Sequence, residues 1–209
     1  MESLTGEQMV TLLNGLQDHW LYPIAALALG SGMRRGEILG LQWTDVDLDG
    51  ATVRVERSVE ETNDGLRFKE PKTSYGNRLV SLPATSVDAL KAHWRKQSEL
   101  RLALGQGRHS PDSLVFCKID GSPMSPDNLS RDWRAVTDLR KLPRVRFHDL
   151  RHAHASALIA SGQDVLSVSR RLGHGSPVIT LSVYAHQFHK TDDAAAAAIE
   201  AALRTGQKR

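Results

Sequence analysis

The feature that most constrains the fold is helical periodicity on both sides of one short strand-rich stretch. Apolar side chains recur at three- and four-residue spacing through much of 5–43 and 83–204, as in amphipathic helices. Between these regions, residues 52–58 alternate between two faces, and 66–69 and 78–82 are further short strand candidates. The sequence therefore predicts a mainly α fold with one small antiparallel β-sheet, an α+β class.

Prolines, glycines and capping residues set the expected helix boundaries. Thr5 with Gln8 resembles a capping box, and Thr191 is expected to cap the last helix. Gly162 and Gly173 are expected to close helices. Val87, Leu90 and Trp94 form one apolar stripe in the long helix after the strands. We predict helices over 5–16, 23–29, 33–43, 83–104, 125–139, 150–160, 165–172, 176–184 and 192–204.

Composition excludes several classes of protein. A chain of 209 residues with 24% charged residues suits one globular domain over 1–209. A single cysteine, Cys117, excludes a disulfide framework and a Cys-based zinc site, and it suits a cytoplasmic protein. The longest apolar run, 24–29, is too short to cross a bilayer, so we expect no membrane partner. A net charge of +3 permits a nucleic-acid partner without requiring one.

The segment His148-Asp149-Leu150-Arg151-His152 begins a predicted helix. His148 and Arg151 are three positions apart and share a face, and a helix N-terminus favours an anion. This arrangement suits a phosphate. A basic surface cluster or a zinc pair formed by His148 and His152 are the alternatives, although no Cys or carboxylate clearly completes a tetrahedral zinc site.

Three further groups could take part in chemistry. Arg34 follows a glycine break and can pair with Glu37 on the same helix face, although such a pair is also ordinary on a surface. Gly173 predicts a turn that presents His174 at a rim. Tyr184 ends the next helix, where a lone tyrosine usually packs; as a nucleophile it needs neighbours that ease its ionisation.

Taken together and in order, these motifs resemble the tyrosine recombinase (phage integrase) family. The motifs are Gly-Met-Arg-Arg-Gly-Glu at 32–37, a lysine in a hairpin-like loop, His-Asp-Leu-Arg-His at 148–152, Leu-Gly-His at 172–174 and Tyr-Ala-His at 184–186. The resemblance runs from Thr5 to the last helix, essentially the catalytic domain of the family. Each motif alone is weak, but five in a fixed order are specific.

The resemblance implies a role for each matching residue. The implied catalytic residues are Arg34, Lys72, His148, Arg151, His174 and Tyr184, with Glu37 as the acidic companion of Arg34. Lys72 is preferred over Lys69 because its Pro-Lys-Thr context matches the family better. His154 stands where the family often has an aromatic residue, and we interpret it as a core or rim residue rather than a ligand.

The implied reaction is DNA strand cleavage and rejoining through a 3′-phosphotyrosyl intermediate on Tyr184. The two arginines would clamp the phosphate oxygens, in place of a metal ion. Lys72 would protonate the leaving 5′ oxygen, His148 would accept the tyrosyl proton, and His174 would donate to a phosphate oxygen. Nearby cations are expected to lower the tyrosine pKa. The resemblance implies no cofactor, no metal and no nucleotide.

The resemblance also implies partners. These are double-stranded DNA and, for a full-length recombinase on DNA, a homotetramer, with a monomer expected for this domain alone. Family members carry a separate helical DNA-binding domain before the catalytic domain, which this chain is expected to lack. The last segment, 191–209, is either a packed terminus or a helix exchanged between protomers. The implied setting is DNA recombination or integration by a mobile element.

Two other functions remain open at this point. Residues 163–186 could form the two helices of a non-catalytic helix-turn-helix DNA-binding module, but such a module does not need the distant Arg34 and Lys72. A type IB topoisomerase shares the tyrosine chemistry. The Leu-Gly-His turn and the small size of the chain favour the recombinase.

Overall fold

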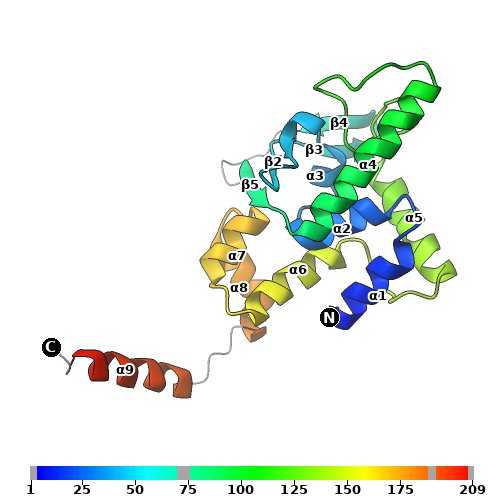
Figure 1. Ribbon diagram of the computed structural model, residues 1–209. Helices are drawn as coiled ribbons and strands as arrows, with labels where there is room; N and C mark the ends of the chain where they lie inside the picture. Colours follow the sequence, from blue (N-terminus) through cyan, green and yellow to red (C-terminus); the bar gives the residue numbers. More distant parts are fainter. Residues whose placement is uncertain (1–3, 70–75, 188–191, 207–209) are drawn as a thin grey trace.

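The computed structural model describes residues 4–69, 76–187 and 192–206 (Figure 1). Its helices are α1 (Gly6–Leu16), α2 (Tyr22–Ser31), α3 (Arg35–Leu39), α4 (Ala84–Ala103), α5 (Pro126–Leu139), α6 (Asp149–Ala160), α7 (Val165–Leu172), α8 (Pro177–Tyr184) and α9 (Asp192–Gly206), with 3-10 turns η1 (Trp43–Asp45) and η2 (Ala185–Gln187). The strands are β1 (Val46–Asp47), β2 (Thr52–Val55), β3 (Ser58–Thr62), β4 (Gly65–Lys69) and β5 (Arg78–Ser81). The mainly α class with antiparallel strands is confirmed.

Helix α2 is the centre of the molecule. Its sequence is apolar on every side, and most of its residues are buried. It packs against α4 on one side and α6 on another, with α1 and α3 also in contact. Helix α2 ends at Gly32, where the chain leaves the core. Helices α6 and α7 also lie near this end of α2. Within the described residues, no helix is long and apolar enough to cross a lipid bilayer.

The predicted single sheet is in fact two. Strands β1, β2 and β5 form one antiparallel sheet in that order, with Val53 opposite Val80. Strands β3 and β4 form a separate hairpin. The predicted strand 52–58 divides because Arg57 turns aside to form an ion pair with Asp45.

Two helix predictions were wrong in detail. The predicted helix 33–43 is only the five-residue α3, because the chain after Gly40 runs extended beside another segment. Val115 N–H donates to the Leu41 carbonyl there, and Trp43 N–H donates to the Ser113 carbonyl. The stripe expected on α4 also ends early, since Trp94 is 42% exposed.

Several boundaries are confirmed. The capping box of α1 is present, and α5, α7 and α8 end where the sequence predicts. Gly173 closes α7 in the left-handed conformation. The expected cap at Thr191 lies outside the described residues.

Candidate active site

Two arginines from distant parts of the chain are held side by side at the end of α7. The left-handed turn at Gly173, with φ of 68°, leaves the last carbonyls of this helix without helical partners. Arg151 Nη2 donates to the Leu172 carbonyl at 2.8 Å, and Arg34 Nη2 donates to the Gly173 carbonyl at 3.1 Å. Consecutive carbonyls therefore fix both guanidinium groups at one place.

Arg151 is built into the core. It is 5% exposed, and its Nη1 donates to the Gly32 carbonyl at the end of α2. Burial lowers its pKa to about 9, with the positive charge of Arg34 acting in the same direction. Arg151 therefore remains a cation at neutral pH.

Glu37 holds Arg34 and is shared with a second arginine. Its carboxylate accepts from Arg34 Nη1 at 2.8 Å and from Arg78 Nη2 at 2.8 Å. Burial alone would raise the pKa of Glu37. The hydrogen bond from Arg78 and the charges of Arg78 and Arg34 outweigh burial and hold this pKa below its usual value. The predicted Arg34–Glu37 pair is confirmed, and it is an ion triad rather than a simple pair.

His174 lies at the rim next to these cations, as predicted. Its Nδ1 is 2.8 Å from the Thr180 hydroxyl on α8. Burial lowers its pKa to about 4, and Arg151 and Arg34 add to the shift. His174 is therefore neutral at neutral pH and retains one ring N–H to donate.

Tyr184 is buried between α6, α7 and α8. It is 4% exposed and packs in a cluster with Ala155 and Leu172. Its hydroxyl lies 2.6 Å from His152 Nδ1. Burial raises the pKa of Tyr184 more than the charge of Arg151 lowers it. The predicted lowering by a nearby cation is present, from Arg151, but the loss of contact with water outweighs it.

His148 begins α6 at the border of the site. It is the N-cap residue of that helix, and its ring lies 5.0 Å from the ring of His152, edge to face. Burial lowers its pKa, followed by repulsion from His152 and Arg151. His148 thus lies beside the site, but the hydrogen bond of the Tyr184 hydroxyl goes to His152.

Comparison with known proteins decides the family. The family model described as "Phage integrase family" matches residues 2–191. The chain belongs to this family.

Curated relatives match this integrase-family chain over part of their own length. It is 29% identical to a tyrosine recombinase XerC-like protein of Caldanaerobacter subterraneus subsp. tengcongensis, over 91% of this chain and 51% of the relative. It is 34% identical to the ICEBs1 integrase of Bacillus subtilis, over 82% of this chain and 46% of the relative. The chain thus spans about half the length of the curated relatives it matches.

Solved structures share the fold. The Tn1549 transposon integrase in complex with circular intermediate DNA has a TM-score of 0.75 at 22% identity, over 95% of this chain and 66% of that chain. The XerA recombinase has a TM-score of 0.68 at 21% identity, over 93% of this chain and 61% of that chain.

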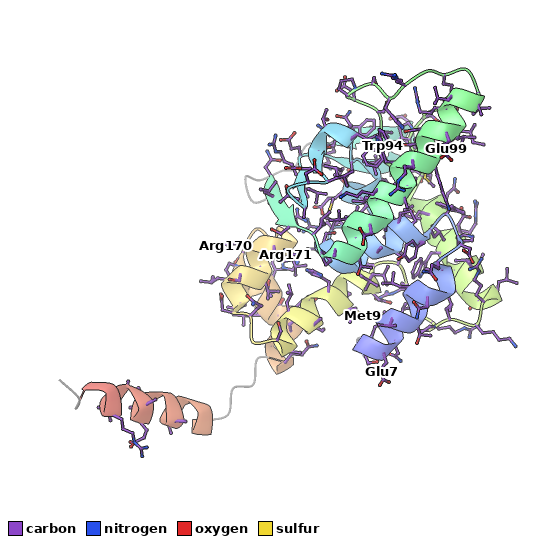
Figure 2. The ribbon with its side chains drawn as sticks, in the orientation of Figure 1. Glu7, Met9, Trp94, Glu99, Arg170 and Arg171 are labelled. Atoms are coloured by element: carbon purple, nitrogen blue, oxygen red, sulfur yellow. The ribbon has the colours of Figure 1, made fainter. Side chains whose placement is uncertain are left out.

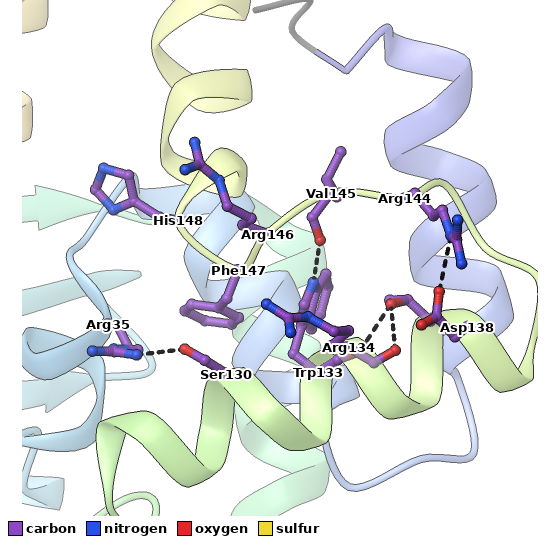
Figure 3. A pocket seen from close by; sticks show the side chains of 11 residues that line it. Arg35, Ser130, Trp133, Arg134, Asp138, Arg144, Val145, Arg146, Phe147 and His148 are labelled. Carbon is purple, nitrogen blue, oxygen red and sulfur yellow. Dashed lines mark hydrogen bonds and ion pairs between the residues drawn. The ribbon is translucent and has the colours of Figure 1, made fainter.

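A basic pocket of about 660 Å³ adjoins the candidate site (Figure 3). It lies between α5 and the segment that leads into α6, with His148 at one end. Arg35 donates to Ser130 across it, and Arg144 pairs with Asp138. The cationic residues that line the pocket are Arg35, Arg134, Arg144 and Arg146.

Sequence reasoning missed Arg78 and His152. Arg78 begins β5, where a strand pattern gives no hint that its side chain is 8% exposed. Its Nε donates to the Arg171 carbonyl, so it joins the sheet to α7 as well as to Glu37. His152 directly follows Arg151 in the motif and was considered only for a zinc pair. No cluster of three or more His, Cys, Asp or Glu side chains suited to a metal ion occurs among the described residues.

The remaining predictions concern His154 and the lysines. His154 is a core residue, as predicted: its Nδ1 donates to the Leu29 carbonyl, and its Nε2 accepts from Arg171 Nε. Arg171 lies on the side of α7 that faces the body, whereas Arg170 points outward (Figure 2). Lys72 lies outside the described residues, and Lys69 is bonded to Glu60.

Proposed function

We propose that this chain is the catalytic domain of a site-specific DNA recombinase or integrase. It cleaves and rejoins DNA strands through a 3′-phosphotyrosyl intermediate on Tyr184. The observation that carries this proposal is the pair of guanidinium groups, Arg34 and Arg151, fixed on the consecutive carbonyls of Leu172 and Gly173. Tyr184 is close enough to Arg151 for the positive charge of this arginine to act on the tyrosine pKa and lower it.

The arrangement suits phosphoryl transfer. Charge spreads over the non-bridging oxygens in the transition state, so fixed cations that need no rearrangement lower the barrier. The remaining N–H groups of Arg34 and Arg151 bind these oxygens, and His174 donates a further hydrogen bond. Glu37 keeps Arg34 in place. His148 lies at the end of the site nearest the basic pocket.

The reaction conserves the energy of the broken phosphodiester bond in the phosphotyrosine linkage. Tyr184 Oη bonds to phosphorus and gives its proton to a neighbouring histidine as the bond to the 5′ oxygen breaks, and that oxygen takes a proton from Lys72. A 5′ hydroxyl of another strand then attacks the phosphotyrosine, forms a new phosphodiester bond and releases the free tyrosine side chain. No nucleotide, cofactor or metal ion enters this scheme.

The DNA partner is double-stranded and lies along the basic pocket. Four arginines line that pocket, which begins at His148 and so continues from the site of the scissile phosphate. The Tn1549 integrase, which shares this fold, is in complex with DNA, and this supports the assignment.

We further propose that residues 191–209 are exchanged between protomers of a tetramer on DNA, and that the domain alone is a monomer. Ile199 and Leu203 on α9 are 63% and 61% exposed, and α9 stands apart from the other helices (Figure 1). Sedimentation with and without DNA tests this assembly.

The helix-turn-helix alternative fits less well. A recognition helix presents polar or basic side chains to the major groove. The exposed side chains of α8 include Val178, Ile179 and Val183, which are apolar. Helix α7 also gives its terminal carbonyls to Arg34 and Arg151. A type IB topoisomerase activity would relax supercoiled DNA without a preferred sequence, and a plasmid relaxation assay separates it from recombination.

The test is a covalent trap. The chain is incubated with a pool of nicked duplexes of randomised sequence, on which cleavage releases a short strand and prevents rejoining. We expect SDS-resistant adducts that enrich particular sequences, and none with Tyr184→Phe. An adduct of undiminished yield with Tyr184→Phe would reject Tyr184 as the nucleophile.

Cleavage is also expected to persist in EDTA, because arginines rather than a divalent ion carry the positive charge at the phosphate. Loss of adduct in EDTA with recovery in Mg²⁺ would instead identify a metal-dependent nuclease.

A further inference from the structure

His152 has a contact that the family resemblance did not assign. It lies on α6, one residue after Arg151, and its Nδ1 is 2.6 Å from the Tyr184 hydroxyl on α8. The two rings are 5.8 Å apart and tilted by 54°. This distance is that of a strong hydrogen bond, so the orientation of the phenol is tied to one imidazole nitrogen.

The chemistry of the pair allows the Tyr184 hydroxyl to donate the hydrogen bond. The Tyr184 hydroxyl carries a proton, because burial raises its pKa. Burial also lowers the pKa of His152, so this ring is neutral at neutral pH. A neutral imidazole offers one bare nitrogen and one N–H. In the tautomer that carries the ring hydrogen on Nε2, the hydroxyl donates to Nδ1.

The contact with Tyr184 favours His152 over His148 as the proton acceptor. The ring of His148 is edge to face with that of His152, and Tyr184 lies against His152. Arg151 and Arg146 disfavour a charge on His152, whereas Asp149 favours it. Five titratable or charged groups face His152 within the part of the chain that the structure describes. They are His148, Asp149 and Arg151 on or at the start of α6, Arg146 in the preceding segment, and Tyr184 on α8.

We propose that His152 is the catalytic base of this site, accepting the Tyr184 proton as the phenol oxygen attacks the phosphate. The proposal rests on the proposed function. In the step, the Oη–P bond forms and the P–O5′ bond breaks. The phenol proton moves to Nδ1, and the leaving 5′ oxygen is protonated by the general acid of the proposed function. Rejoining reverses each transfer, so His152 returns the proton to Tyr184.

The test compares His152→Asn with the unaltered chain in the covalent trap. Asparagine places a hydrogen-bond acceptor near the position of Nδ1 but cannot take up a proton. We expect cleavage to slow by about 10²- to 10⁴-fold, with DNA affinity unchanged. The difference in cleavage rate between His152→Asn and the unaltered chain is expected to shrink as pH rises, because tyrosinate then forms without a base. His19→Asn, in a histidine that lines a different pocket, serves as the matched control.

Two results in that assay would overturn the proposal. One is a cleavage rate for His152→Asn equal to that of the unaltered chain. The other is a loss of the same size at every pH, since a residue that only supports the fold would give such a loss.

A second measurement needs no DNA and so separates this proposal from the proposed function. The His152 ring is titrated by NMR in the unaltered chain and in Tyr184→Phe. A hydroxyl that donates to Nδ1 favours the neutral ring, so His152 is expected to titrate at higher pH once the hydroxyl is removed. An unchanged midpoint would contradict the hydrogen bond itself. A chain that forms no adduct but shows this shift would reject the recombinase while retaining the pair.

Discussion

At the scale of single residues, the site depends on charged groups that are buried together with groups of opposite charge. Glu37 is 6% exposed and lies between Arg34 and Arg78. An isolated carboxylate at this depth would be costly, but two guanidinium groups compensate for its lost hydration. Arg78 thereby becomes a positioning residue, because it holds the carboxylate that holds Arg34.

Replacing Arg78 tests this arrangement. Arg78→Ala leaves Glu37 with one cation, and we expect the free energy of unfolding to fall by about 3 kcal/mol. Urea denaturation provides the measurement. Arg131→Ala is the control, because that arginine is 71% exposed and only weakly paired, and it is expected to change stability by less than about 0.5 kcal/mol. Equal effects of the two changes would refute a structural role for Arg78.

From the environment of His154 we predict that the free energy of unfolding depends on pH. The ring must be neutral, because Nε2 accepts from Arg171, and burial lowers its pKa from 6.5 to about 4. The unfolded chain therefore binds the proton more tightly than the folded one. The stabilisation is fully present above pH 6.5 and is lost as pH falls towards 4, for a total of about 3 kcal/mol.

Unfolding free energies measured by urea denaturation across this pH range check the prediction. His154→Asn is expected to flatten the curve by about that amount, since asparagine does not titrate. A mutant curve as steep as that of the unaltered chain would show that other groups cause the acid sensitivity.

Single residues were predictable only where a motif marked them. Arg34, Glu37, Arg151, His174 and Tyr184 stand in motifs. The structure places the first four around Gly173, and Tyr184 packs against Leu172. Arg78 and His152 were missed because their importance comes from partners elsewhere in the chain. A strand pattern records which side chains face the core, but it does not show which buried carboxylate a strand-end arginine will meet.

At the scale of elements, helix ends do most of the positioning. Helix α2 ends at Gly32 and α7 at Gly173, both left-handed. The carbonyls exposed by these turns accept from Arg151 and Arg34. The site is therefore assembled from the ends of rigid helices.

Two glycines test the importance of that geometry. Gly32 and Gly162 both have positive φ, but a Cβ at Gly32 would lie 2.5 Å from His154 and 2.9 Å from Leu172, whereas at Gly162 it meets nothing within 4 Å. Gly162→Ala should cost only the left-handed strain, about 1 kcal/mol. Gly32→Ala should cost clearly more and should also displace the partner of Arg151. Similar melting curves for both variants would contradict this.

The sequence predicted elements well where local signals agreed. Ser-Pro pairs marked the beginnings of α5 and α8, and glycine marked the end of α7. The predicted helix 33–43 failed because its second half pairs with residues 113–115, which lie far away in the sequence. The division of the strands into two sheets depends equally on a distant partner, Asp45.

At the scale of the whole molecule, the proposed interaction with DNA is electrostatic. A net charge of +3 is small, but arginines gather in the pocket beside His148 (Figure 3). Each phosphate contact releases counterions, so affinity should fall steeply with salt. Local concentration of charge therefore matters more than the net value.

Fluorescence anisotropy with labelled duplex DNA over a range of salt measures this effect. Arg134→Ala and Arg144→Ala should each reduce the slope of log affinity against log salt by about one. Lys118→Ala, in a different pocket, should leave the slope unchanged. Equal slopes for all three variants would place the DNA elsewhere.

Arg151 joins the proposed catalytic site to the scaffold. Because its guanidinium ties the end of α2 to the end of α7, a change at this position is expected to lower both cellular abundance and turnover. Replacement of Arg34, whose side chain is 43% exposed, should lower abundance less than replacement of Arg151 does, while turnover is lost in both cases. A mutational scan scored separately for protein level and for DNA cleavage would thus assign the two arginines to different phenotypic classes, although they bind neighbouring carbonyls.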